Sequence, residues 1–189
     1  KAAEAGHILR TAGARTLFTV NGFLDTEYTA MLANAGELPD LSEVVVMRGD
    51  TPKDCTTWDD FLGRAGDADL AVVRARSAAG APGGTGGILF TSATTGAPKG
   101  AMLGHGATVR AYTAWSDVVG LEEGDRYLVV NPFFHAFGLN AGIIACLVSG
   151  ATIVPHPVFD VPSVMRRVDE ERISMLPGAP AIYQTILDH

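Results

Sequence analysis

Hydrophobic positions along the chain follow two alternating patterns. Short runs of β-branched and aromatic residues predict strands, and segments with helical spacing predict the helices that join them. The expected strands are residues 16–20, 43–47, 87–91, 126–130, 151–154 and 173–176. The expected helices are residues 1–13, 23–35, 57–65, 106–119, 139–148, 161–171 and 181–189. This alternation predicts an α/β fold with a mostly parallel sheet flanked by helices.

The expected domain organisation is simple. A chain of 189 residues with 47% hydrophobic content is long enough for one core, so a single domain spanning residues 1–189 is predicted. Residues 78–87 are rich in Gly and Ala and predict a linker or surface loop. Both chain ends fall inside expected helices without a terminating Gly or Pro, which predicts a domain cut at both ends from a longer protein.

Charge, hydropathy and cysteine content argue against several classes of protein. The net charge is −7 and there is no run of Lys or Arg, which argues against nucleic-acid binding. The apolar stretch 138–154 is interrupted by polar residues and is shorter than the roughly 20 residues of a bilayer span. Cys55 and Cys146 lack the spacing of a disulfide framework or a zinc site. These features favour a reducing, cytoplasmic location.

The segment with the most chemistry is residues 88–100, ILFTSATTGAPKG. Ser92, Thr94 and Thr95 offer hydroxyl groups, and the backbone N–H groups around Gly96 can form an anion-binding concavity. Lys99 adds a positive charge. The segment therefore predicts a cradle for a polyphosphate, although it is neither a Walker loop nor a dinucleotide-binding GxGxxG turn.

The string TSATTGAPKG resembles the phosphate-loop signature TSGTTGxPKG of the acyl-adenylate-forming (AMP-binding) superfamily, which includes acyl-CoA ligases, luciferases and nonribosomal adenylation domains. Nine of its ten positions agree, and Ala93 departs from a Gly. That departure costs about 1 kcal/mol if the position needs a positive φ. The resemblance implies that the loop binds the β and γ phosphates of ATP, with Lys99 catalytic and Thr94 or Thr95 near the metal. The implied nucleotide-binding residues are Thr91, Ser92, Ala93, Thr94, Thr95, Gly96 and Lys99.

A second block, residues 131–139 (NPFFHAFGL), resembles the next core motif of the same superfamily. Taken alone, a His among aromatic residues is more often a packed core residue. In combination with the loop, the resemblance implies that His135 lies near the acyl carboxylate as a catalytic residue, and that Phe134 and Phe137 line the acid pocket. A His at this place can donate a hydrogen bond to a developing oxyanion while the rings exclude water.

Most of the other polar residues are expected to have structural roles rather than roles in catalysis or binding. Tyr183, in a segment similar to the family's strand-turn-helix beside the acyl site, is expected to pack in the core. His105 is expected to hold the loop or the start of the next helix. The remaining histidines, His7, His156 and His189, are expected to be exposed or structural. The acidic residues are interpreted as solvated faces rather than metal ligands: Asp25, Glu27, Glu122, Glu123 and Asp125.

The resemblance implies an ATP-dependent carboxylic acid:CoA ligase that forms acyl-AMP and then acyl-CoA, with ATP, Mg²⁺ and coenzyme A as cofactors and substrates. Within the superfamily, the chain is most similar to an actinobacterial group that activates the propanoate side chain of steroid ring-degradation intermediates. Fatty acids are the general alternative. An aryl-acid or luciferase-like adenylating enzyme shares the loop, and Ala93 favours a non-catalytic nucleotide- or acyl-binding module. Because the family's adenine-site block and its C-terminal catalytic Lys are missing from the sequence, the 189 residues alone are expected to be inactive.

Overall fold

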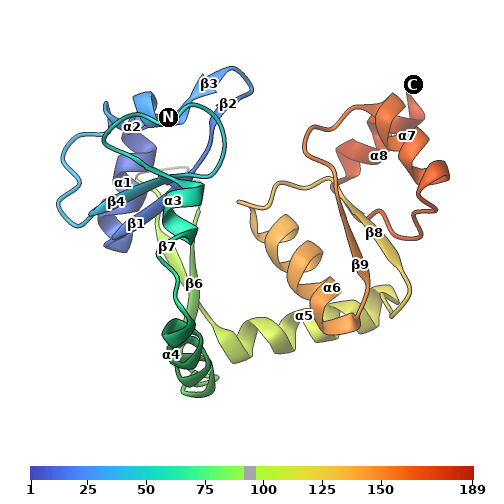
Figure 1. Cartoon of the computed structure of the whole chain (residues 1–189). Helices are drawn as coiled ribbons and strands as arrows, with labels where there is room; N and C mark the ends of the chain where they lie inside the picture. Colours follow the sequence, from blue (N-terminus) through green and yellow to red (C-terminus); the bar gives the residue numbers. More distant parts are fainter. Residues whose placement is uncertain (92–96) are drawn as a thin grey trace. The chain divides into compact units, whose positions relative to one another are not determined.

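A computed structural model describes residues 1–91 and 97–189, apart from the side chains of residues 67 and 68. The chain forms two compact units (Figure 1). Unit 1 consists of Lys1–Ala81 and Phe90–Met102, and unit 2 consists of Pro82–Leu89 and Leu103–His189. Each unit has a parallel sheet and buried residues of its own, and the single domain expected over residues 1–189 stays a prediction.

Unit 1 is built on a small parallel sheet in the order β1-β4-β5. Its strands are β1 (Thr16–Thr19), β4 (Glu43–Val46) and β5 (Thr56–Thr57). The helices of this unit are α1 (Ala2–Ala12), α2 (Tyr28–Leu32), α3 (Trp58–Leu62) and α4 (Asp67–Ala78). Val45 and Val46 of the central strand are buried, as expected for a strand paired on both edges.

The helix expected over residues 23–35 is wrong in its first half. Strands β2 (Asn21–Phe23) and β3 (Thr26–Glu27) form an antiparallel hairpin there, and only the short helix α2 follows. Leu24 and Asp25 at the hairpin tip have φ values of 51° and 54°, the two positive angles that a type I′ turn requires. A turn of this handedness follows the twist of the strands and excludes a continuous helix.

Unit 2 is built on the parallel strands β8 (Arg126–Val129) and β9 (Thr152–Pro155). Its helices are α5 (His105–Val119), the π-helix η1 (Phe137–Ile144), α6 (Ala145–Ser149), α7 (Val161–Glu170) and α8 (Pro180–Leu187). The predicted helix over 139–148 is therefore present, but its first half has π geometry. The strand expected over 173–176 is reduced to one isolated bridge between Met175 and Tyr127.

The core of unit 2 follows the alternation of side chains along β8. Tyr127 and Val129 pack with residues of α5 and α6, including Trp115 and Cys146, while Leu128 packs on the opposite face with residues of α7 and α8. Helices thus cover both faces of the strand pair (Figure 1). Strands covered on both faces read as continuous apolar runs. The predicted α/β class with a parallel sheet is confirmed.

The remaining strands, β6 (Thr85–Phe90) and β7 (Gly100–Gly104), pair with each other. Strand β6 was predicted, but it starts inside the expected loop 78–87. Strand β7 was not predicted, because its sequence GAMLG has little of the β-branched or aromatic character typical of strands. Within the described residues, no helix combines the length and the apolar character that crossing a membrane requires.

Candidate functional site

The predicted phosphate loop connects β6 to β7. Ser92, Ala93, Thr94, Thr95 and Gly96 lie outside the described residues, so their predicted contacts with phosphate and metal stay predictions.

The described flanks of the loop, Thr91 and Lys99, lie side by side in unit 1. The backbone N–H of Thr91 donates to the carbonyl oxygen of Lys99 at 3.0 Å, and the Thr91 hydroxyl lies 3.5 Å from the same oxygen, at the limit of a hydrogen bond. This contact joins the two described flanks at the base of the loop. Lys99 is exposed, so its ammonium group is accessible to a ligand.

The second flank is held by a residue far away in the sequence. The carbonyl oxygen of Pro98 accepts a hydrogen bond of 2.8 Å from Nε2 of His7 in α1. The His7 ring also packs edge-on against Phe90, with ring centroids 6.2 Å apart. His7 was expected to be exposed or structural, and no local sequence signal connects it to a loop 91 residues away.

His105 begins helix α5, as its sequence position suggested. Its backbone N–H donates to the carbonyl oxygen of Gly84 at 3.0 Å, within unit 2. Its ring lies against Gly86 on strand β6, where a Cβ would come within 2.8 Å of His105 Nδ1. A side chain at position 86 would therefore push the ring away, and this close approach explains the glycine.

In unit 2, His135 lies in the segment that follows strand β8. The backbone N–H of Phe137 donates to Nδ1 of His135 at 3.1 Å. Because Nδ1 accepts, the proton of the neutral ring is assigned to Nε2. His135 is exposed, so this Nε2–H group is accessible as a hydrogen-bond donor. The arrangement suits the predicted contact with a carboxylate or an oxyanion.

The turn that carries His135 packs closely against η1. A Cβ on Gly138 would collide with the carbonyl oxygens of Asn131 and Pro132, so only glycine allows this approach. Gly142, one turn along, lies against the side chain of Val129 in β8. Segments of π-helix frequently occur at functional sites, and here one directly follows the predicted acyl motif.

The aromatic residues of this motif have different surroundings. Phe134 is 87% exposed, which makes it available to a ligand. Phe137 is half-buried and packs edge-on against Trp115 of α5, with ring centroids 6.2 Å apart. The described residues therefore place Phe137 in contact with the helix layer, and Phe134 at the surface.

A second segment of unit 2 is tied to this turn. The side-chain amide of Asn131 donates to the carbonyl oxygen of Pro177 at 3.2 Å. The hydroxyl of Tyr183 accepts from the backbone N–H of Gly178 and donates to the carbonyl oxygen of Leu176, both at 2.9 Å. Tyr183 was expected to pack in the core, but the residue is 42% exposed and its hydroxyl stabilises the turn between Leu176 and Gly178.

Two acidic residues of unit 2, Asp125 and Glu171, take part in structural hydrogen bonds. Asp125 accepts from the Ser174 hydroxyl and from the Glu122 backbone N–H, and these bonds lower the pKa of its carboxyl. A hydrogen bond from Arg167 lowers the pKa of Glu171. Among the described residues, no group of three or more His, Cys, Asp or Glu side chains could hold a metal ion.

Both cysteines are free thiols. Burial raises the pKa of Cys146 to about 11. Its thiol is therefore protonated at neutral pH and packs as a small apolar side chain.

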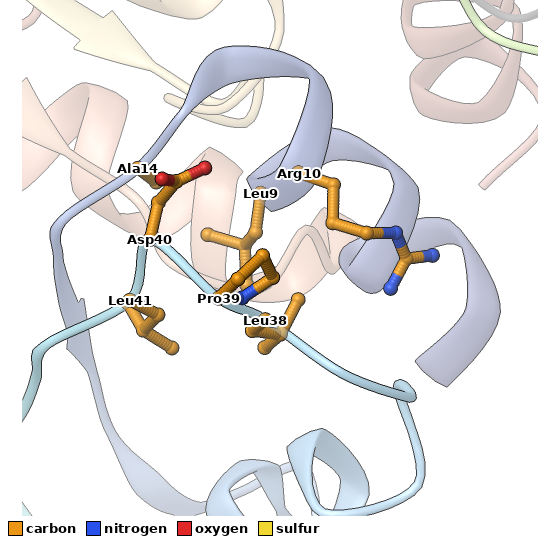
Figure 2. Close-up of a pocket in the computed structure, with 7 residues that line it drawn as sticks. All are labelled: Leu9, Arg10, Ala14, Leu38, Pro39, Asp40 and Leu41. Atoms are coloured by element: carbon orange, nitrogen blue, oxygen red, sulfur yellow. The ribbon is translucent and has the colours of Figure 1, made fainter.

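A surface depression of about 150 Å³ lies in unit 1 between α1 and the segment after α2 (Figure 2). It is lined by Leu9, Arg10, Ala14, Leu38, Pro39, Asp40 and Leu41. The guanidinium group of Arg10 donates to the carbonyl oxygens of Ala35 and Glu37. Much of this space is open to solvent, and the depression has no enclosed volume that could hold a nucleotide.

The class of protein follows from three features together: the loop sequence, the α/β fold and the turn that carries His135. The chain belongs to the family of AMP-binding enzymes, whose family model matches residues 1–189. It is 45% identical over 188 residues to a 3-(7a-methyl-1,5-dioxo-octahydro-1H-inden-4-yl)propanoyl:CoA ligase of Mycobacterium tuberculosis, covering 100% of this chain and 36% of that protein. A ligase of the same name from Rhodococcus jostii is 42% identical over 192 residues, covering 100% of this chain and 37% of that protein.

Solved structures support the fold. The anthranilate CoA ligase AuaEII, crystallised in complex with anthranoyl-AMP, superposes with a TM-score of 0.79 at 23% identity, over 98% of this chain and 34% of that chain. At this identity the likeness shows the fold alone. The chain spans little more than a third of the length of the Mycobacterium and Rhodococcus ligases.

Proposed function

We propose that the protein containing this chain is an ATP-dependent carboxylic acid:CoA ligase that activates the propanoate side chain of a steroid-derived ring compound. The observation that carries the proposal is the 45% identity, along the entire chain, with a ligase whose name specifies such an acid. The chain spans 36% of that relative, so the activity is proposed for the whole protein.

The proposed reaction has two steps. The carboxylate oxygen of the acid attacks the α-phosphorus of ATP, forming acyl-AMP and releasing pyrophosphate. The thiol sulfur of coenzyme A then attacks the acyl carbon, loses its proton, and displaces AMP to give the thioester. Both steps depend mainly on the positioning of reactants and on stabilisation of the developing negative charge.

In this proposal Lys99 binds the terminal phosphates of ATP. Its side chain is exposed, and its backbone carbonyl accepts a hydrogen bond from the Thr91 N–H at the base of the loop. Mg²⁺ would balance the phosphate charge, and the hydroxyl groups of Thr94 or Thr95 would be its protein ligands. Mg²⁺ commonly binds through substrate phosphates with only one or two protein groups, so a full cluster of carboxylates is not required.

The acid is proposed to lie beside His135 and Phe134. The Nε2–H group of His135, set by the bond that Nδ1 accepts from Phe137, would donate to the carboxylate and to the oxyanion. The exposed ring of Phe134 offers apolar surface to a polycyclic acid. Because ATP and coenzyme A are its other substrates, the reaction is proposed to take place in the cytoplasm.

The test is acyl-CoA formation by the full-length protein, measured by mass spectrometry across a panel of acids. The panel contains the bicyclic dione propanoate, octanoate, palmitate, ferulate and benzoate, each with ATP and coenzyme A. The proposal predicts the highest kcat/KM for the bicyclic acid. A preference for an aromatic acid would support an aryl-acid ligase instead, and ATP binding without any thioester product would support a non-catalytic binding module.

A further inference from the structure

Helix α1 is fixed against the rest of unit 1 by contacts on one of its sides. Gly6 approaches Ala35 so closely that a Cβ would collide with the Ala35 carbonyl oxygen. Arg10, one turn later, donates to the carbonyl oxygens of Ala35 and Glu37 at 2.9 and 3.1 Å. Residues four apart lie on the same side of a helix, so these contacts set the rotation of α1 and the direction of its neighbouring residue His7.

His7 contacts both flanks of the predicted phosphate loop. Its Nε2 atom lies 2.8 Å from the Pro98 carbonyl oxygen, and its ring packs edge-on against Phe90. Thr91, next to Phe90, donates to the carbonyl oxygen of Lys99, next to Pro98. The contacts around the base of the loop therefore join five residues: His7, Phe90, Thr91, Pro98 and Lys99.

We propose that His7 is a positioning residue for ATP binding, which acts by holding Pro98 and thereby directing the Lys99 side chain toward the phosphates. This inference rests on the proposed function. It adds His7 of α1, which lies outside the loop, to the residues that support ATP binding. A carbonyl oxygen can only accept, so His7 must donate through Nε2–H, and the ring does so in its neutral and its protonated form. Since the Pro98 carbonyl is partly buried, losing this donor leaves the carbonyl without its partner.

Two substitutions separate the hydrogen bond from the ring contact. His7→Phe keeps a ring against Phe90 and removes the donor. His7→Gln restores an amide N–H at a reach similar to that of Nε2 and removes the ring. His189→Gln, at an exposed histidine in unit 2, is the matched control.

The experiment compares these variants in the full-length protein. Steady-state kinetics give KM for ATP, acid and coenzyme A, and hydrogen exchange reports the Thr91 amide that donates to Lys99. His7→Phe is expected to raise KM for ATP about 3- to 10-fold, the range expected for one lost hydrogen bond, with KM for acid and coenzyme A unchanged. It is also expected to accelerate exchange at Thr91, and His7→Gln is expected to restore both quantities to wild-type values.

The inference is overturned if His7→Phe leaves KM for ATP and Thr91 exchange unchanged, or if it raises all three KM values equally. It is also overturned if His7→Gln behaves like His7→Phe, because the donor would then not be the cause. Failure of the proposed function is distinct, since the wild-type protein would then form no thioester with any acid. In that case ATP affinity measured by calorimetry, together with Thr91 exchange, still decides the role of His7.

Discussion

The two predicted binding segments are supported in different ways. In unit 2, the His135 segment follows β8, where Tyr127, Leu128 and Val129 are at most 1% exposed. In unit 1, Thr91 and Lys99 are exposed, and a few hydrogen bonds and one ring contact hold the flanks of the loop. Core packing thus supports the segment that carries His135, and individual contacts support the described flanks of the predicted phosphate loop. Core substitutions should therefore reduce stability, and loop substitutions should reduce ligand binding with little loss of stability.

The largest expected effect is on the core of unit 2. Leu128→Ala removes a fully buried side chain between β8 and the layer of α7 and α8, and should lower the free energy of unfolding by about 2–5 kcal/mol. Urea denaturation followed by circular dichroism measures the change. Leu147→Ala, at a 68% exposed position on α6, is the control and should change stability by no more than about 0.5 kcal/mol. If both variants lost the same free energy of unfolding, the buried face of β8 would not be more important for stability than the exposed surface of α6.

The next effect tests the phosphate motif. Lys99→Ala should reduce kcat/KM for ATP about 100-fold in the full-length protein, because a charged contact to phosphate is lost. Its unfolding free energy should stay within about 0.5 kcal/mol of wild type, since Lys99 is exposed. Pyrophosphate exchange into ATP gives the rates, and Lys53→Ala, at another exposed lysine of unit 1, is the matched control. If the Lys99 variant were as active as the Lys53 variant, Lys99 would not bind the phosphates of ATP as proposed.

The acyl motif gives a third test. His135→Phe should lower kcat about 10- to 100-fold, because a hydrogen bond to a charged group is lost, while KM for ATP is unchanged. Its stability should be close to that of wild type, because His135 is exposed despite its place after a buried strand. Single-turnover measurement of acyl-AMP formation separates chemistry from product release. An increase in KM for ATP without a change in kcat would assign His135 to the nucleotide instead of the acid.

The smallest expected effect is a pH dependence within unit 2. Burial and the charge of Arg167 lower the pKa of His156 from its ordinary 6.5, while the nearby Asp160 and Glu171 act in the opposite direction. The unfolded chain therefore binds this proton at higher pH than the folded chain, so the stability that the neutral ring contributes is fully present above 6.5 and is lost as the pH falls through the lowered pKa.

His156→Gln should accordingly flatten the decline of unfolding free energy between about pH 7.5 and pH 5.5, measured by urea denaturation. His189→Gln is the control, because this exposed histidine should leave the decline unchanged. The same decline in wild type and in the His156 variant would mean that other groups cause the acid sensitivity.

Much of the fold could be predicted from apolar patterns. Strands β1, β4 and β8 and helices α5, α7 and α8 occur close to where the hydrophobic spacing places them. The pattern failed where a turn decided the structure, since the positive φ values of Leu24 and Asp25 convert an expected helix into a hairpin. The pattern also failed for β7. Gly100 and Gly104 give no strand signal, and this segment is a strand because it pairs with β6.

The candidate site was only partly predictable for a similar reason. Lys99 and His135 belong to contiguous motifs that can be recognised in the sequence. His7 is connected to Pro98 only by the packing of α1, which depends on contacts of Gly6 and Arg10 with residues 25 to 29 positions away. The π geometry of η1 and the hydrogen bond from Phe137 to His135 also arise from tertiary packing, and no spacing rule predicts them.

The most direct test of the account is a crystal structure of the full-length protein with a non-hydrolysable ATP analogue. If Lys99 binds the terminal phosphates, its Nζ should lie about 2.7–3.2 Å from an oxygen of the β or γ phosphate, with the triphosphate enclosed by residues 91–99. An analogue whose phosphates bind elsewhere, with Lys99 and the loop out of reach, would contradict it.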